Sequence, residues 1–237
     1  MLYQITDGSV SAGGMLILSH IDFEIKGNEK VAVVGRNGAG KTTLLKLIAG
    51  EMTLDRDDRR TGPGIVKSRQ VTVGMLKQQA FGDNGRTVEE ELLAACPCKD
   101  TFARERFEYE REYDRLFTGF GFTKADKRRP LKEFSGGEQT KIALIRLLLE
   151  KPDILLLDEP LTSLDVVVSE EMKQLLRSLK AGRITIFSTH IMDLALDLCD
   201  EIVLLNHGEL EVVEKTDMDS REFRDKIIAA LREDEHE

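Results

Sequence analysis

A short glycine-rich segment holds the residues best suited to chemistry. Gly35–Thr42 reads G-R-N-G-A-G-K-T and fits the pattern G-x-x-x-x-G-K-S/T. Glycines let the backbone curl so that successive N–H groups point inward, and a following helix adds its positive dipole end, which together bind a polyanion. Lys41 can then reach the β- and γ-phosphates of a nucleotide, and the Thr42 hydroxyl can bind Mg²⁺. The alternative is a glycine-rich turn with a surface lysine.

The flanking residues place this segment between a strand and a helix. Lys30–Val34 is a β-branched run that stops at Gly35, and apolar residues recur at helical spacing from Lys41 to Ala49. This is the context that phosphate binding requires. We therefore predict a phosphate site made of Gly35, Asn37, Gly38, Ala39, Gly40, Lys41, Thr42 and Thr43.

A second set of chemical groups follows an apolar run. Ile154–Leu157 is continuously apolar, as expected for a central parallel strand covered on both faces, and it delivers Asp158 and Glu159 at its end. Ligands of such sheets bind at the carboxyl edge. Taken alone, this feature is an ordinary turn after a core strand. Combined with Lys41, it predicts phosphoryl transfer to water, with Asp158 on the metal and Glu159 on the nucleophile.

Strands and helices alternate along most of the chain, which favours an α/β fold with a mainly parallel sheet covered by helices. The predicted strands are Leu16–Ile25, Lys30–Val34, Val71–Leu76, Ile154–Asp158, Arg183–Ser188 and Glu201–Asn206. The predicted helices are Lys41–Ala49, a segment after Glu138, Val166–Lys180, a helix between Ser188 and Glu201, and an amphipathic Ser220–Arg232 before an acidic tail. The charged stretch from Thr87 to about Leu116 is predicted to be mostly helical.

Composition limits the class of ligand. The 237 residues carry a net charge of −9, which works against nucleic acid as a general ligand, so we expect no direct DNA binding. The clusters Arg56–Arg60 and Lys124–Arg129 are interleaved with Asp and indicate solvated faces. Apolar runs are far shorter than a membrane span, and we expect a cytoplasmic protein. The three cysteines, in no redox or zinc spacing, are expected to be reduced.

Phe134–Gln139 reads F-S-G-G-E-Q and resembles the signature motif of the ATP-binding cassette (ABC) family. Physically it is a second anion site, because a serine and two glycines at a helix start can present a hydroxyl and backbone N–H groups to a γ-phosphate. The residues concerned are Ser135, Gly136 and Gly137. In the family this site faces the ATP held by the other subunit, so the resemblance implies a second ABC domain as partner, in a homo- or heterodimer.

The resemblance assigns further roles residue by residue, with ATP and Mg²⁺ as cofactors. Gln78 is similar to the family's Q-loop glutamine, which senses Mg²⁺ and the attacking water, although Gln79 competes for this role. Leu164–Asp165 resembles the end of the D-loop, and His190 the switch histidine that contacts the γ-phosphate. The implied catalytic residues are Glu159, His190 and Gln78, and the implied metal ligands are Thr42, Gln78 and Asp158.

The chain departs from the family upstream of the glycine loop. The family usually places an aromatic residue there to stack on adenine, and the corresponding position here is Ala12. Tyr3 is the nearby aromatic candidate.

The resemblance also implies an architecture: one nucleotide-binding domain over residues 1–237 with a RecA-like P-loop NTPase core and an N-terminal antiparallel β subdomain. A helical subdomain is expected at approximately 80–150, and a C-terminal helix with an acidic tail at approximately 218–237.

The two halves of the chain resemble different branches of the family. Gly64–Lys67, Val73–Gln78 and Ser135–Lys141 resemble the ABC-F branch, whose members act on the ribosome as translation factors or antibiotic-resistance proteins. Glu159–Asp165 and Ser188–Gly208 are more similar to the ATPase subunit of a membrane exporter.

Two further features favour a transporter. ABC-F proteins typically carry Thr-Asn-His where this chain has Leu161–Ser163, and they usually hold two cassettes where this sequence shows one. We predict an ATPase that powers a transporter through a transmembrane permease subunit at the inner face of the membrane. The alternatives are a ribosome-associated ATPase and a mosaic of the two branches.

Overall fold

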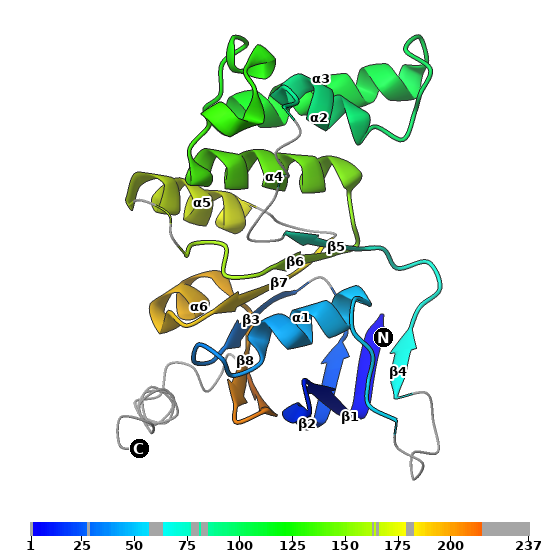
Figure 1. Ribbon diagram of the computed structural model, residues 1–237, viewed down its shortest axis with the longest axis vertical. Helices are drawn as coiled ribbons and strands as arrows, with labels where there is room; N and C mark the ends of the chain where they lie inside the picture. The colour runs from blue at the N-terminus through cyan, green and yellow to red at the C-terminus, as the bar shows by residue number, and fades with distance from the viewer. Residues whose placement is uncertain are drawn as a thin grey trace. The chain divides into compact units, whose positions relative to one another are not determined.

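The computed structural model describes residues 2–27, 29–56, 64–76, 81, 85–162, 164, 166–178 and 183–214. The chain forms two compact units (Figure 1). The first, here called the sheet unit, comprises Met1–Met75, Asp153–Glu159 and Leu179–Glu237. The second, the helical unit, comprises Leu76–Pro152 and Pro160–Ser178.

A six-stranded sheet is the main layer of the sheet unit (Figure 1), with strand order β5-β6-β7-β3-β8-β9. Strands β6, β7, β3 and β8 are parallel, and β9 runs antiparallel to β8 at one edge. Their bounds are β3 Lys30–Val34, β5 Val73–Leu76, β6 Ile154–Leu157, β7 Ile184–Thr189, β8 Glu201–Asn206 and β9 Glu209–Glu214. All residues of β6 and β7 are buried, which explains the continuously apolar sequence of β6, and β7 also buries the polar residues Thr185, Ser188 and Thr189.

A second, antiparallel sheet in the sheet unit has the order β2-β1-β4. Its strands are β1 Tyr3–Ala12, β2 Met15–Ile25 and β4 Ile65–Lys67. Strands β1 and β2 form a hairpin whose turn consists of Gly13 and Gly14, with φ of 60° and 82°. Two consecutive residues with positive φ give the turn that matches the twist of a hairpin, and glycine adopts this conformation without steric cost.

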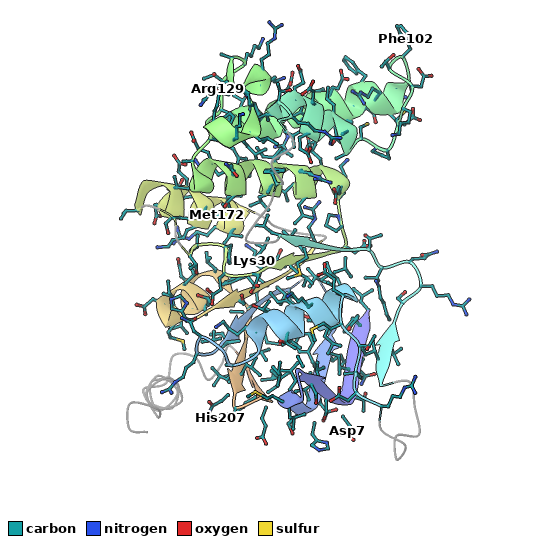
Figure 2. All side chains as sticks on the ribbon, in the orientation of Figure 1. Asp7, Lys30, Phe102, Arg129, Met172 and His207 are labelled. Atoms are coloured by element: carbon teal, nitrogen blue, oxygen red, sulfur yellow. The ribbon has the colours of Figure 1, made fainter. Side chains whose placement is uncertain are left out.

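The β8–β9 hairpin ties the two sheets together. Its turn, His207–Gly208 (Figure 2), also has two positive φ values, 46° and 82°. A Cβ at Gly208 would lie 2.5 Å from the carbonyl oxygen of Ile17 on β2, and the Ser19 amide donates to the Gly208 carbonyl at 2.8 Å. This turn therefore packs directly against the antiparallel sheet.

Helices α1 (Lys41–Ala49) and α6 (Met192–Leu198) belong to the sheet unit. One face of α1 is buried through Leu44, Leu45, Leu47 and Ile48, in the same apolar cluster as Val31 and Val33 of β3. The helix ends at Gly50, whose φ of 78° is the left-handed conformation common after a helix. This packing fixes the start of α1 relative to the sheet edge.

The helical unit contains α2 (Val88–Ala94), α3 (Arg104–Gly119), α4 (Gly136–Glu150) and α5 (Val166–Ser178). Two short 3-10 helices, η1 (Asp126–Arg128) and η2 (Leu131–Glu133), lie between α3 and α4. The unit has its own apolar cluster, with Val88 and Leu92 from α2, Tyr113 and Phe117 from α3, and Ile142 and Ile145 from α4. Among the described residues, no helix is both long and apolar enough to cross a membrane.

The predicted α/β fold with a mostly parallel sheet is confirmed, and Lys30–Val34, Lys41–Ala49 and Glu201–Asn206 have the predicted bounds. The stretch predicted to be mostly helical from Thr87 to about Leu116 consists of two helices, α2 and α3, separated around Pro97. Strands β1, β4 and β9 were not predicted, and the predicted Ser220–Arg232 helix lies outside the described residues.

The Tyr113 hydroxyl is buried and, within the described part of the chain, has no hydrogen-bond partner. Its desolvation raises the pKa of Tyr113. We expect Tyr113→Phe to stabilise the protein by about 1 kcal/mol, because the unpaired group is removed and the ring is kept. Tyr109→Phe is the matched control: the Tyr109 hydroxyl donates to the Leu92 carbonyl at 2.6 Å, so its removal should destabilise. Urea unfolding midpoints measure both, and a destabilised Tyr113→Phe contradicts the prediction.

Candidate functional site

The loop after β3 can be built only from particular glycines. A Cβ on Gly35 would lie 2.4 Å from the backbone carbonyl oxygen of Leu205, so no side chain fits there. Gly38 and Gly40 have φ of 86° and 104°, a left-handed conformation that other residues rarely adopt. A Cβ on Gly40 would also press on Ile17 and Leu18. The predicted glycine positions therefore follow from backbone geometry.

Helix α1 begins in a form suited to an anion. Its N-cap is Gly40, which offers no side-chain acceptor to the amides of Lys41, Thr42 and Thr43 in the first turn. No acidic side chain lies in that turn. The uncapped amides and the positive end of the helix dipole therefore fit the phosphates of a nucleotide. Asn37 is exposed and Ala39 half-buried on the same loop.

The Lys41 side chain is 5% exposed and folds back under the loop. Its ammonium donates to the carbonyl oxygens of Gly35 at 2.9 Å and Arg36 at 2.8 Å. The same Nζ lies 3.2 Å from Oε1 of Glu159. A buried ammonium without hydrogen-bond acceptors is energetically costly, so Lys41 stays bound to oxygen atoms. A nearby phosphate offers equivalent oxygen acceptors.

Asp158 connects the loop helix to the neighbouring strand ends. Its Oδ2 accepts a hydrogen bond from the Thr42 hydroxyl at 2.8 Å, and its Oδ1 accepts one from the Ser188 hydroxyl at 2.7 Å. Ser188 also accepts from the Glu159 amide at 2.8 Å. A hydroxyl and a carboxylate side by side are the oxygen ligands that Mg²⁺ takes beside substrate phosphates, so the residues fit this ion.

Ser188 had not been predicted as a site residue. It lies in the buried β7. Because Leu157 of β6 pairs with Phe187 of β7, the next residues, Asp158 and Ser188, lie side by side. One hydroxyl thus fixes both the Asp158 carboxylate and the Glu159 backbone. The sequence signal is the serine near the end of the Ile184–Thr189 strand, which pairs with the strand that precedes Asp158.

Glu159 lies between two potential partners. Its Oε1 is 3.2 Å from Lys41 Nζ and 3.7 Å from Nδ1 of His190, which follows β7. The Glu159 backbone has a φ of 45°, which is unusual for a non-glycine residue and marks many functional positions. The structure therefore brings Lys41, Thr42, Asp158, Glu159 and His190 together at the carboxyl ends of β3, β6 and β7.

The Ser135 turn starts α4 in the helical unit. Ser135 is the N-cap: its hydroxyl accepts from the Glu138 amide at 3.3 Å and donates to Glu138 Oε2 at 2.9 Å. Glu138 Oε2 also accepts from the Ser135 amide at 2.8 Å, which completes a capping box. Gly136 and Gly137 form the first turn, and a Cβ on Gly137 would meet Val168 at 3.2 Å. Glu138 thus holds the donors predicted to face an anion.

Gln78, its competing candidate Gln79, and Asp165 lie outside the described residues. The aromatic candidate for adenine stacking is wrong. Tyr3 is 2% exposed, its hydroxyl donates to the Leu47 carbonyl at 3.3 Å, and burial raises its pKa to about 12. Tyr3 is therefore part of the core. Ala12 is exposed at the end of β1.

Comparison with known proteins identifies the family. The family model described as ABC transporter matches residues 18–162, more than half of the chain. The chain belongs to the ABC transporter family. The match covers the glycine loop, the Ser135 turn and the Asp158–Glu159 pair. It identifies the chain as an ABC ATPase domain.

Curated relatives in the family differ in how much of their length the chain covers. The Bacillus subtilis ATP-binding protein YdiF is 33% identical over 70% of this chain and 30% of its own length. The sulfate/thiosulfate import ATP-binding protein CysA of Mycobacterium bovis is 32% identical over 88% of this chain and 60% of its own length. The aliphatic sulfonates import ATP-binding protein SsuB of Bacillus thuringiensis subsp. konkukian is 32% identical over 93% of this chain and 90% of its own length.

Solved structures of the family share the fold. An ATP-binding subunit of an ABC transporter superposes with a TM-score of 0.77 at 25% identity, covering 92% of this chain and 91% of that one. The architecture described above is therefore that of ABC ATPase domains.

Proposed function

We propose that this chain is the ATP-hydrolysing subunit of a membrane transporter and works as one half of a pair of ABC domains. The observation that carries the proposal is the meeting of Lys41, Thr42, Asp158, Glu159 and His190 at one edge of the parallel sheet. Binding of the triphosphate, binding of a metal and activation of water each have a residue of the required chemistry there.

The glycine loop and the start of α1 bind the phosphates. The amides of Gly38, Gly40 and the first turn of α1 face the polyanion, and Lys41 exchanges its bonds to loop carbonyls for bonds to phosphate oxygens. This exchange also frees the Glu159 carboxylate from its ion pair with Lys41. Nucleotide binding therefore makes the Glu159 carboxylate available to the attacking water.

Thr42 and Asp158, with Gln78 from the resemblance, would hold Mg²⁺. When bound, this ion would supply positive charge that offsets the negative charge of the phosphate groups. Ser188 keeps Asp158 in place through its hydroxyl. Glu159 orients the attacking water and accepts its proton, and His190 donates a hydrogen bond to the γ-phosphate as charge develops there.

The active site is completed by a second ABC domain. The Ser135 turn presents a hydroxyl and the amides of Gly136 and Gly137 to the nucleotide of the partner, so two domains close two sites head to tail. Because that hydroxyl is bonded to Glu138 here, an incoming γ-phosphate must displace a carboxylate of the same charge.

We expect Glu138→Gln to strengthen ATP-dependent pairing by about fivefold, because a neutral amide keeps the helix cap but removes roughly 1 kcal/mol of like-charge repulsion. The measurement is the protein concentration at which half the chains pair in ATP, determined by sedimentation. Glu133→Gln removes a nearby carboxylate that is paired with Arg129 and not with Ser135, and it should leave pairing unchanged. Weaker pairing in Glu138→Gln would show that the carboxylate instead holds Ser135 in its binding shape.

Transport as the purpose of hydrolysis is supported by the names of the relatives. CysA and SsuB are ATP-binding proteins of importers, and SsuB matches this chain over nearly the full length of both. We therefore place the protein at the inner face of the membrane, bound to a permease. The stretches that resemble the ABC-F branch, Gly64–Lys67 and Val73–Gln78 among them, support the ribosome as the alternative partner.

The two partners are separated by cosedimentation. A Glu159→Gln protein trapped with ATP is mixed either with membranes that carry a candidate permease or with purified ribosomes. Retention by the membranes, lost without the permease, supports the transporter function. Pelleting with ribosomes would overturn it in favour of the ABC-F function.

A further inference from the structure

A buried carboxylate joins two helices of the helical unit. The Glu91 side chain on α2 is 7% exposed. Its Oε1 accepts from the Arg146 guanidinium on α4 at 2.6 Å, and its Oε2 lies 3.2 Å from the Arg86 guanidinium. Arg146 lies eleven residues after Ser135 on the helix that this serine caps. One acidic side chain therefore binds the start of α2 to the body of α4.

Such a pair has little value as a source of stability alone. The free-energy cost of desolvating buried charges offsets most of the gain from their attraction. Proteins in which apolar residues replace such a pair are often as stable. Charge-assisted hydrogen bonds between a guanidinium and a carboxylate are, however, directional, and they fix the register of the elements they join. The consequence of the Glu91 pairs is therefore the position of α4 relative to α2.

A second connection reaches the chain on the other side of Ser135. The Leu131 amide donates to the Arg86 carbonyl at 3.0 Å, and the Val88 amide donates to the Arg129 carbonyl at 3.1 Å. This short antiparallel bridge centres on Thr87 and Pro130, five residues before Ser135. The start of α2 therefore binds the segment that enters the Ser135 turn, while Glu91 binds the helix that leaves it.

The entering segment is itself held in place. The Arg129 guanidinium, labelled in Figure 2, lies 4.2 Å from the ring centroid of Phe134 and pairs with Asp126 at 2.7 Å. Phe134 is buried and directly precedes Ser135. Little freedom is left between the bridge and the serine, so the position of α2 is transmitted to the turn.

We propose that Glu91 is a positioning residue for the Ser135 turn: through Arg86 and Arg146 it holds the turn where it can close on the nucleotide of the partner domain. This inference rests on the proposed function, because the turn acts only in a pair of ABC domains. Glu91 touches neither the nucleotide nor the reacting atoms.

The test compares Glu91→Gln with Glu150→Gln in the full chain. Glu150 also pairs with Arg146, at 3.5 Å, but its side chain is 42% exposed, so it controls for the loss of one arginine partner. We expect Glu91→Gln to lower the kcat of ATP hydrolysis about tenfold with KM for ATP changed less than about twofold, because nucleotide binding is intact and closure is impaired. Glu150→Gln should change neither.

A readout that does not depend on hydrolysis accompanies the kinetics. Amide hydrogen exchange at Leu131, Glu138 and Gln139 should be about tenfold faster in Glu91→Gln than in the unmodified chain or in Glu150→Gln. If Glu91→Gln does not fold, the double variant Glu91→Leu with Arg146→Leu restores packing without charge and should show the same loss of kcat.

The outcomes separate the two proposals. An unmodified chain without ATPase activity overturns the proposed function, and exchange at the three amides then still decides whether Glu91 positions the turn. Unchanged exchange, an unchanged kcat in an active chain, or a rise in KM equal to the fall in kcat would each overturn the role of Glu91.

Discussion

Glu159→Gln will bind ATP with nearly unchanged affinity and will lose at least about a hundredfold in kcat, since general-base catalysis contributes on the order of 100- to 10,000-fold. The amide keeps the size of the side chain but cannot accept the proton of water. Because the nucleotide then persists, the two domains stay closed, and a stable ATP-bound pair should accumulate. Single-turnover hydrolysis and size-exclusion chromatography in ATP measure these two effects.

Asp193→Asn is the control for this experiment. Asp193 is an exposed carboxylate three residues after His190, in the first turn of α6, and its replacement should leave kcat unchanged. A Glu159→Gln protein that turns over at more than about a tenth of the normal rate would remove Glu159 from the role of base.

Lys41→Ala will weaken ATP binding by about a hundredfold or more, because it removes charge-assisted hydrogen bonds to phosphate oxygens worth roughly 1.5–3 kcal/mol each. The change also removes the ammonium that lies 3.2 Å from the Glu159 carboxylate, so the phosphate site becomes more negative by one charge. Both effects act in the same direction. Equilibrium titration with a fluorescent ATP analogue gives the Kd directly.

Lys46→Ala provides the comparison on the same helix. Lys46 lies in the last turn of α1, away from the glycine loop, and its loss should leave the Kd within about twofold. Equal weakening by the two substitutions would mean that α1 is destabilised as a whole and that Lys41 has no specific contact with the nucleotide.

The elements around the site could be predicted because local sequence and burial agree there. Ile154–Leu157 is apolar at every position and lies in the sheet with both faces covered, and Lys30–Val34 stops where Gly35 meets the Leu205 carbonyl. Strand β1 was harder to predict, because its register shifts near Gly8 and Asp7 has a φ of 48°. Such irregular pairing depends on the contacts of β1 with β2. It disrupts the regular alternation of apolar and polar residues by which a strand is recognised in a sequence.

Motifs predicted the residues that the structure brings together at the sheet edge, and a residue that belongs to no motif was missed. Lys41, Asp158 and Glu159 stand in patterns whose chemistry can be read residue by residue. Ser188 is one of three polar residues in the buried β7, and its bond to Asp158 depends on the pairing of β6 with β7. Tyr3 was considered as an adenine contact by residue type alone, whereas its burial in the core depends on the fold.

The two glycine-containing hairpin turns of the sheet unit have opposite consequences for protein engineering. A Cβ at Gly13 or Gly14 would meet nothing within 4 Å, so an epitope tag or a permuted terminus placed there disturbs no neighbouring backbone. The turn at Gly208 has the same signs of φ but is wedged against Ile17, so an insertion there separates the two sheets. Loops of equal length and conformation thus differ in how readily they accept foreign sequence.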